Sequence, residues 1–253
     1  MNGVNFDRAA GYYDATRGLP DAVSDAITDV LADELNGRGL CLEIGVGTGR
    51  IALPLAERGI PLVGADIAGA MLQRLVANAG GKPPFGLALA DAARLPMRDA
   101  SLGAVLASHV LHLIPGWPAV VDEARRVLRH GGVLLVDFGG GAPAPWSRWS
   151  GELMHGLGVT RLRPGVSKPD DVTSHLPAGT PVRALPAVTM NVTRRLGDDL
   201  DEWEQQIHSW TWFYEAGQIT AAVAAVRAEA GRRGWPLDRE VTLTRRIQWW
   251  AFG

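Results

Sequence analysis

A strand, a glycine-rich turn and a helix follow one another directly, and this order constrains the fold more than any other feature of the chain. The apolar run 40–44 is typical of a buried strand, and Gly45, Gly47 and Gly49 come directly after it. From Ile51 onward, apolar residues recur at helical spacing. Glycine backbone can approach a ligand closely, and a helix N-terminus favours negative charge. The segment therefore predicts an α/β sheet with a nucleotide-like ligand at the turn.

The residues beside the glycines distinguish between ligands. The dinucleotide fingerprint G-x-G-x-x-G/A requires a small residue where this chain has Arg50. Glu43, two residues before the first glycine, would repel a pyrophosphate and could hold an ammonium group. The loop therefore favours a ligand with a cationic end. A nicotinamide-dependent oxidoreductase is disfavoured, also because no tyrosine of the sequence is followed four residues later by the lysine of short-chain dehydrogenases.

Strand and helix patterns alternate from residue 40 to about residue 138, which predicts a parallel sheet with helices on both faces. Strands are predicted over 40–44, 61–65, 85–90, 102–107 and 133–138. Helices are predicted over 51–57, 69–78 and 117–128, with a turn at 130–132. Upstream, residues 19–35 have an amphipathic pattern that predicts one further helix.

The composition changes after residue 138. Residues 139–145 form a glycine- and proline-rich hinge, and eight of the nine tryptophans lie beyond it. One or two short helices are predicted within 146–180. Alternating patterns predict strands over 182–195 and 239–250, and the segment 198–231 between them is predicted to be mostly helical.

The overall composition narrows the functional classes. The formal net charge of −2 gives no basic excess, so a nucleic-acid partner is not expected. The single cysteine, Cys41, precludes an intramolecular disulfide and a thiolate metal cluster, and no metal site is expected. No signal-peptide pattern follows Met1, and the longest mainly apolar stretch, 102–114, is too short to span a bilayer. A cytoplasmic protein without a membrane span is therefore expected.

Polar residues end three further predicted strands, and ligands of open α/β sheets bind at the carboxyl ends of the strands. Asp66 lies about 20 residues after the first glycine, where a carboxylate can accept hydrogen bonds from both ribose hydroxyls. The alternative role for Asp66 is to cap the next helix. Asp91, with the backbone N–H of Ala92, can contact an adenine edge or, alternatively, cap a loop. Ser108 and His109 follow the next strand.

As a set, these segments closely resemble the class I S-adenosylmethionine-dependent methyltransferases, particularly the small-molecule group (methyltransferase type 11) that includes the quinone C-methyltransferases. The likeness covers about residues 5–138. It rests on the segments 42–50, 63–72, 90–96, 105–113 and 123–132, with Phe6-Asp7-Arg8, Tyr13-Asp14 and Arg17 also matching. The resemblance implies a Rossmann-like fold with a seven-stranded, mostly parallel sheet, helices on both faces, an antiparallel last strand and a helical substrate cap.

The resemblance further implies a single methyltransferase domain of four parts. These are an N-terminal helical segment over the cofactor (1–39), a cofactor-binding core (40–138), a hinge and cap insertion (139–181), and late strands with an aromatic-rich helix that complete the substrate pocket (182–253).

The cofactor implied by the resemblance is S-adenosylmethionine, which becomes S-adenosylhomocysteine. Within the implied site, Glu43 would lie near the ammonium group, Asp66 at the ribose hydroxyls, Ile67 and Met71 beside the adenine, and Asp91 at the adenine amine. The three glycines would pack against the methionine part, and the two N-terminal residues would close over the cofactor. The full set is Tyr13, Arg17, Glu43, Gly45, Gly47, Gly49, Asp66, Ile67, Met71, Asp91, Ala92, Ser108 and His109.

Methyl transfer from a sulfonium is an in-line displacement, and an oxygen, nitrogen or carbon acceptor needs only help in losing a proton. His109 and His112 are the candidate bases, and His155 and His208 are more remote ones. Each is alternatively a structural, hydrogen-bonding histidine. A small, apolar or aromatic acceptor is expected because aromatic residues gather after the hinge, although core packing is the alternative interpretation of this cluster. The residues concerned are Trp146, Trp149, Trp210, Phe213 and Tyr214.

Two rival functions use the same fold. A non-catalytic cofactor-binding or regulatory protein would bind the cofactor without turnover. An RNA or DNA methyltransferase is disfavoured by the charge balance and by the segment 108–111, which is not the Asn/Asp-Pro-Pro-Tyr/Phe/Trp sequence of such enzymes. The expected partner is a small-molecule methyl acceptor, and the oligomeric state, monomer or homodimer, is left open.

Overall fold

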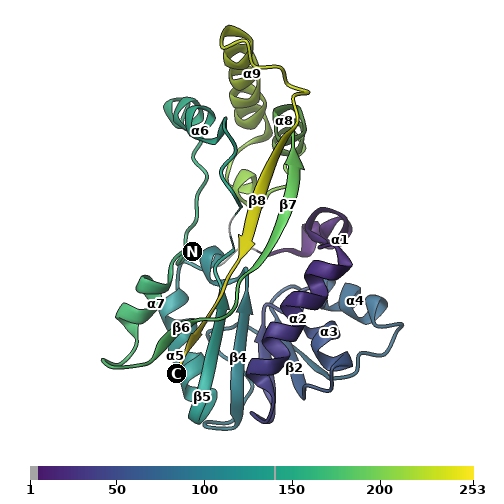
Figure 1. The fold of residues 1–253 in the computed structure, drawn as a ribbon, viewed down its shortest axis with the longest axis vertical. Coiled ribbons are helices and arrows are strands. Elements are labelled where there is room, and N and C mark those ends of the chain that lie inside the picture. The colour runs from purple at the N-terminus through teal and green to yellow at the C-terminus, as the bar shows by residue number, and fades with distance from the viewer. Residues whose placement is uncertain (1–4, 140) are drawn as a thin grey trace. The chain divides into compact units, whose positions relative to one another are not determined.

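A seven-stranded sheet forms the centre of the first of two units in the computed structural model, which describes residues 5–139 and 141–253 (Figure 1). This unit comprises the described residues up to Gly139, together with Pro164–Val188 and Ile247–Gly253. The strand order is β3-β2-β1-β4-β5-β9-β6. The strands are β1 (Cys41–Ile44), β2 (Leu62–Asp66), β3 (Gly86–Leu89), β4 (Leu102–Ser108), β5 (Leu128–Asp137), β6 (Val182–Ala184) and β9 (Trp249–Phe252).

The sheet is parallel except for its last strand. Strands β1 to β5 pair in parallel, whereas β9 runs antiparallel to both of its neighbours, β5 and β6. Every residue of β1 and β4 is buried, as expected for central strands covered on both faces. The predicted Rossmann-like sheet with an antiparallel last strand is confirmed.

The helices cover both faces because the strand order reverses between β1 and β4. Right-handed crossovers place α3 and α4 on one face and α5 on the other. The helices predicted over 19–35, 51–57, 69–78 and 117–128 are confirmed to within two residues at each end. The helical elements of this unit are η1 (Asp7–Ala9), α1 (Tyr13–Arg17), α2 (Asp21–Leu35), α3 (Ala52–Glu57), α4 (Gly69–Asn78), η2 (Leu111–Leu113), α5 (Trp117–Val127) and α7 (Pro169–His175).

The predicted turn at 130–132 lies inside β5 rather than before it. Leu102 pairs with Leu128, but Ala104 already pairs with Val133, so the β5 side carries extra residues at this point. Gly131 accommodates the irregularity with a φ of +73°. The strand start predicted at residue 133 was therefore wrong, because a bulge interrupts the pairing without ending the strand.

The two late strand patterns each divide into two strands. The range 182–195 contains β6 and β7 (Val188–Arg194), separated by Pro186, which has no N–H to donate to a ladder. The range 239–250 contains β8 (Val241–Ile247) and the start of β9, separated at Gln248. Strands β7 and β8 pair with each other in a separate two-stranded sheet. The prediction of single strands was wrong, because residue alternation continues where the pairing partner changes.

The second unit comprises residues 141–163, together with Thr189–Arg246. The segment predicted to be mostly helical over 198–231 consists of three pieces, and a capping box of Glu215 and Gln218 starts the longest of them. Trp146 and Trp203 are fully buried in the core of this unit. Its helices are α6 (Ser147–Gly156), α8 (Leu196–Glu204), η3 (Ser209–Phe213) and α9 (Ala216–Arg232).

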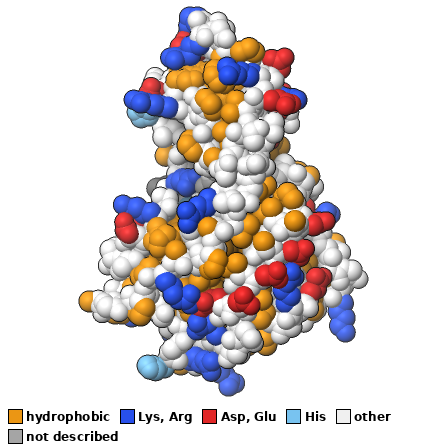
Figure 2. All heavy atoms as spheres, viewed as in Figure 1, with side chains coloured by type: hydrophobic (Ala, Val, Ile, Leu, Met, Phe, Trp, Pro, Cys, Tyr) orange, Lys and Arg blue, Asp and Glu red, His pale blue; other side chains and the backbone are white. Residues whose placement is uncertain are grey.

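Two surface properties complete the description. On the face drawn in Figure 2, basic and acidic side chains are intermixed and are not gathered by sign. Across the two described ranges, no helix is both long enough and apolar enough to cross a membrane.

Candidate functional site

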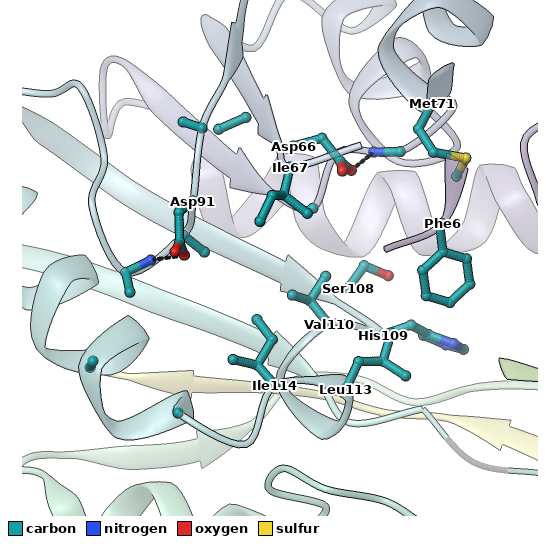
Figure 3. A pocket seen from close by; sticks show the side chains of 18 of the residues that line it. Phe6, Asp66, Ile67, Met71, Asp91, Ser108, His109, Val110, Leu113 and Ile114 are labelled. Atoms are coloured by element: carbon teal, nitrogen blue, oxygen red, sulfur yellow. Dashed lines mark hydrogen bonds between the residues drawn. The ribbon is translucent and has the colours of Figure 1, made fainter. Parts of the chain in front are cut away.

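A cavity of about 420 Å³ lies at the carboxyl ends of the central strands, where the strand order reverses (Figure 3). This is the position at which open α/β sheets bind ligands, and the volume is in the range of small-molecule sites. Most residues predicted to contact the cofactor line it. They are Tyr13, Gly45, Gly47, Asp66, Ile67, Met71, Asp91, Ala92, Ser108 and His109.

The glycine loop after β1 has a backbone conformation that residues with side chains rarely adopt. Gly45, Gly47 and Gly49 have φ values of +64°, +57° and +87°. A Cβ on Gly45 would come within 2.3 Å of Val110 Cγ2. Gly49 does not line the main cavity; with Arg17 it lines a neighbouring hollow. The loop therefore presents bare backbone at Gly45 and Gly47, where a ligand can approach closely.

Asp66 both caps backbone groups and faces the cavity. Its Oδ2 accepts a hydrogen bond from the Gly47 N–H, and its Oδ1 accepts one from the Ala68 N–H, each at 2.8 Å. Burial raises the pKa of the Asp66 carboxyl, and these backbone N–H groups partly oppose the shift. A carboxylate has about four acceptor positions, so the two backbone bonds leave capacity for ligand hydroxyls. The capping and ligand-binding interpretations are thus compatible.

Asp91 lies farther along the cavity. Its Oδ1 accepts a hydrogen bond from the Ala93 N–H at 2.9 Å. In Figure 3, Asp91 lies toward one end of the cavity, and Phe6 and His109 lie toward the other. The apolar side chains of Val110, Leu113 and Ile114 also line the cavity.

Glu43 is buried in β1 and is not among the residues that line the cavity. The residue is 2% exposed, and among the residues that the structure describes its Oε2 has no hydrogen-bond partner. Burial raises the pKa of the Glu43 carboxyl to about 8; Arg50 opposes this shift, Asp66 adds to it, and the Ala52 N–H opposes it. A buried carboxyl oxygen without a partner is costly in a folded protein, and a cationic ligand group would offset that cost.

His109 and Asp137 form a pair at the ends of β4 and β5. His109 Nε2 lies 2.9 Å from Asp137 Oδ2, and the Gly139 N–H donates to Asp137 Oδ1 at 2.8 Å. His109 has a left-handed backbone, with a φ of +55°. Burial alone would raise the pKa of Asp137, but hydrogen bonding and charge from His109, the Gly139 N–H and the charge of Arg50 hold it below its usual value. The carboxyl therefore stays ionised and fixes the imidazole.

Sequence reasoning missed Asp137 and Phe6 as parts of this site. Asp137 ends β5 at the same edge as the other strand-end acids, a signal that the apolar run before it concealed. Phe6 lines the cavity, and its ring lies 6.0 Å from that of Tyr13. The N-terminal segment is held to α4 by Asp7, whose Oδ1 accepts the Ala70 N–H at 2.8 Å.

Other predicted residues lie outside this cavity. His112 is in η2, with its ring 6.3 Å from that of His109, and is not part of the lining. In the second unit, Trp146 is buried and its indole N–H donates to Asp199 at 2.9 Å. Trp149, Trp210 and Tyr214 pack partly buried against the same core, whereas Phe213 is 46% exposed. His155 Nδ1 lies 3.0 Å from Thr160 Oγ1, and His208 Nε2 lies 2.8 Å from Glu202 Oε2.

Comparison with known protein sequences gives consistent matches. A family model described as a methyltransferase domain matches residues 42–136. An uncharacterized methyltransferase of Mycobacterium tuberculosis is 34% identical over 173 residues, which cover 68% of this chain and 67% of that protein. A malonyl-[acyl-carrier protein] O-methyltransferase of Xylella fastidiosa is 32% identical over 139 residues, covering 53% of this chain and 47% of that protein. The chain thus spans about half the length of the latter relative.

Solved structures share the fold. A protein of Anabaena variabilis, described as a methyltransferase from an antibiotic biosynthesis pathway, has a TM-score of 0.60 at 16% identity, covering 92% of this chain and 98% of that one. The phosphoethanolamine N-methyltransferase 2 of Haemonchus contortus, solved with phosphomonomethylethanolamine and S-adenosylhomocysteine, has a TM-score of 0.54 at 16% identity. The superposed region covers 97% of this chain and 57% of the Haemonchus contortus enzyme.

Proposed function

The chain belongs to the class I S-adenosylmethionine-dependent methyltransferases, and on this premise we propose that it binds S-adenosylmethionine in the cavity at the carboxyl ends of the central strands and methylates a small molecule. The observation that carries the proposal is one cavity lined by bare glycine backbone and two acids, with a third acid buried in the strand before the glycine loop. Asp66 and Asp91 line the cavity, and Glu43 lies buried in the strand that leads into the glycine loop.

The described residues fit the cofactor in chemistry. The methionine part would pack on Gly45 and Gly47. Its ammonium group would offset the cost of burying the Glu43 oxygen that has no hydrogen-bond partner. The ribose hydroxyls would donate to the remaining acceptor positions of Asp66. The adenine would lie beside Ile67 and Met71, with its edge at Asp91 and the Ala92 N–H. Tyr13 and Phe6 would cover it from the N-terminal segment, with Arg17 close by.

His109 is the proposed base. His109 Nε2 lies 2.9 Å from the Asp137 carboxyl, which would stabilise the charged imidazole formed when the ring takes the proton that the acceptor loses. The bound cofactor supplies a methyl group that is already activated by a positively charged sulfur. The residues of the chain would orient the acceptor in line with this methyl group and exclude water. The separation of His109 from the Asp91 end supports this assignment, because the reacting methyl is remote from the adenine (Figure 3).

The acceptor would be small and apolar or aromatic. Phe6, Leu113 and Ile114 line the cavity with apolar surface. The aromatic residues predicted for acceptor contacts belong to the second unit, and their role stays a prediction; they are Trp146, Trp149, Trp210, Phe213 and Tyr214. The methylated atom would be an oxygen, nitrogen or carbon.

Calorimetry with S-adenosylmethionine and S-adenosylhomocysteine tests the proposal. We expect the wild-type protein to bind both, and Asp66→Ala to weaken binding by an order of magnitude or more. Asp238→Ala, which removes an exposed carboxylate of the second unit, is the matched control and should bind as the wild type does. Absence of binding to the wild-type protein would refute the proposed function.

An acceptor screen would then identify the substrate. Quinones, phenols, amines and small acids would be incubated with S-adenosylmethionine, and formation of S-adenosylhomocysteine would be measured. A malonyl thioester belongs in the screen because a relative of this chain is a malonyl-[acyl-carrier protein] O-methyltransferase. Cofactor binding without turnover on any acceptor would favour a non-catalytic role instead.

A further inference from the structure

Arg50, directly after the glycine loop, lines the hollow beside the cavity and contacts a residue of the cavity lining. Its Nη2 donates a hydrogen bond to Ser108 Oγ at 3.2 Å. Ser108 is 8% exposed and pairs in the sheet with Asp137, which is 5% exposed. The guanidinium is therefore anchored beside the carboxyl that holds His109.

The same guanidinium also acts on Glu43. The Glu43 carboxyl accepts the N–H of Ala52, two residues after Arg50, and Arg50 is the positive charge that stabilises its ionised form. The other charged group that acts on Glu43 is Asp66, whereas Asp137 is acted on by His109 and Arg50. Arg50 is thus a positive charge that is held beside Asp137 through Ser108 and also acts on Glu43.

We propose that Arg50 is a positioning residue that serves both halves of the methyl-transfer site, keeping Glu43 ready for the cofactor ammonium and Asp137 ready to hold His109. This inference rests on the proposed function, because it takes the cavity to be the cofactor site. It assigns a role to the residue that separates the loop from the dinucleotide fingerprint. The charge of Arg50 matters here, and a small residue at this position could not supply it.

Loss of Arg50 would affect the two carboxyls in the same direction. Without the nearby guanidinium, Glu43 and Asp137 would both hold protons more strongly. A protonated Glu43 attracts an ammonium group less, and a protonated Asp137 no longer favours the charged imidazole. Cofactor binding and proton transfer would therefore weaken together, although the two carboxyls belong to different strands.

Calorimetric titration with S-adenosylhomocysteine between pH 6 and pH 9 tests the inference without any acceptor. We expect wild-type affinity to rise with pH as Glu43 loses its proton near pH 8. Arg50→Gln should bind tenfold or more weakly at pH 7.5, with the midpoint of the pH dependence moved to higher pH. Arg50→Lys keeps the charge and should restore most of the affinity. Arg98→Gln, which removes an exposed charge from the same unit, is the matched control.

The outcomes separate the inference from the proposed function. If wild-type protein does not bind S-adenosylhomocysteine, the proposed function fails. If wild type binds and Arg50→Gln matches it in affinity and in pH midpoint, only the role of Arg50 is refuted. Circular dichroism establishes that each variant is folded. Should Arg50→Gln unfold, Ser108→Ala removes the acceptor of the guanidinium and should give a smaller shift in the same direction; an unchanged midpoint there would overturn the inference.

Discussion

His109 has a left-handed backbone that non-glycine residues seldom adopt, and its imidazole is tied to the buried carboxyl of Asp137. Strained residues of this kind persist only when their surroundings hold them in place. Here the His109 N–H donates to the backbone carbonyl of Asp137 while the side chain binds the carboxyl of the same residue. The ring orientation is thus fixed from two directions before any ligand arrives.

Asp137→Asn should separate proton transfer from cofactor binding. The amide keeps the size of the carboxyl but cannot stabilise a charged imidazole, so the methylation rate constant should fall roughly 10²- to 10³-fold. S-Adenosylhomocysteine affinity should change less than threefold, because Asp137 does not line the cavity. Initial rates with an acceptor from the screen and calorimetry provide the two readouts. Combining Asp137→Asn with His109→Ala should reduce the methylation rate constant no further than His109→Ala alone does. Additive reductions would contradict the pairing.

Glu43 should make stability depend on pH. Its pKa is about 8 in the folded protein against an ordinary value of 4.5, so the folded state keeps a proton that the unfolded state has lost. This contribution to stability is present below pH 4.5 and is lost as the pH rises to about 8. Glu43→Gln should remove this pH dependence. The difference in free energy of unfolding between the variant and wild type should therefore shift in favour of the variant by on the order of a few kcal/mol from pH 5 to pH 8.5. Urea unfolding at both pH values measures it; parallel pH curves for the two proteins would contradict the burial argument.

Sequence reasoning located the acids that follow the early strands better than the groups behind them. Asp66 and Asp91 stand at the ends of short, regular strands, so their position follows from the pattern alone. The partnership of Asp137 with His109 depends on which strands are neighbours, and the sequence does not state that β4 and β5 place these residues side by side. Phe6 was matched as part of a motif, but its contact with the cavity depends on the docking of the N-terminal segment on α4.

At the scale of elements, the turn between β1 and α3 offers a test of close packing. Gly45 and Gly59 both have left-handed backbones, but only a Cβ on Gly45 would meet a neighbour within 4 Å. Gly59→Ala should therefore lower the free energy of unfolding by about 1 kcal/mol, because alanine disfavours the left-handed backbone conformation. Gly45→Ala should cost roughly 1–3 kcal/mol more because of the contact with Val110. It should also weaken S-adenosylhomocysteine binding, which Gly59→Ala should not. Equal losses of stability in thermal unfolding would rule out the steric argument.

The early elements could be predicted and the late ones only partly. From β1 to β3 and again from β4 to α5, strands and helices follow one another as the residue periods indicate, although the segment 90–101 joins β3 to β4 without a helix. The late strands keep their residue alternation across Pro186 and Gln248, where the pairing partner changes. The side chain of Gln248 there donates to the carbonyl of Leu185, a contact that no local pattern reports. Periodicity identifies which face a residue occupies but not which strand lies beside it.

At the scale of the whole molecule, the two units have separate cores, and this predicts separable effects. Trp146→Ala should lower the free energy of unfolding of the second unit by roughly 3–5 kcal/mol, since the side chain is fully buried. S-Adenosylhomocysteine affinity should stay near that of wild type, because every residue lining the cavity belongs to the first unit. Hydrogen exchange and calorimetry give the two measurements. Leu106→Ala in β4 is the comparison, and it should weaken binding as well; a tenfold loss of affinity in Trp146→Ala would contradict the separation.

The division of the chain was visible in its composition only at one boundary. The glycine and proline residues after Phe138 mark the first passage out of the sheet unit. The return at Pro164 coincides with a single Pro-Gly pair, which also marks ordinary turns, and the later passages near Val188 and Ile247 carry no comparable glycine run. These boundaries depend on strand pairing between residues distant in sequence, above all on the position of β9. Local residue preferences do not reveal such pairing.

The position of β9 also has a consequence for biosynthesis. Although β9 follows every other strand in sequence, it lies between β5 and β6, so β6 has no sheet neighbour until β9 arrives. A nascent chain on the ribosome can assemble β1 to β5 early, but its sheet stays open along β5 until Trp249–Phe252 has been translated and released from the exit tunnel. During that interval β5 presents an unpaired edge, which is the form of strand most prone to pairing with another chain. Chaperone demand during synthesis should therefore concentrate in the time between translation of β5 and translation of β9.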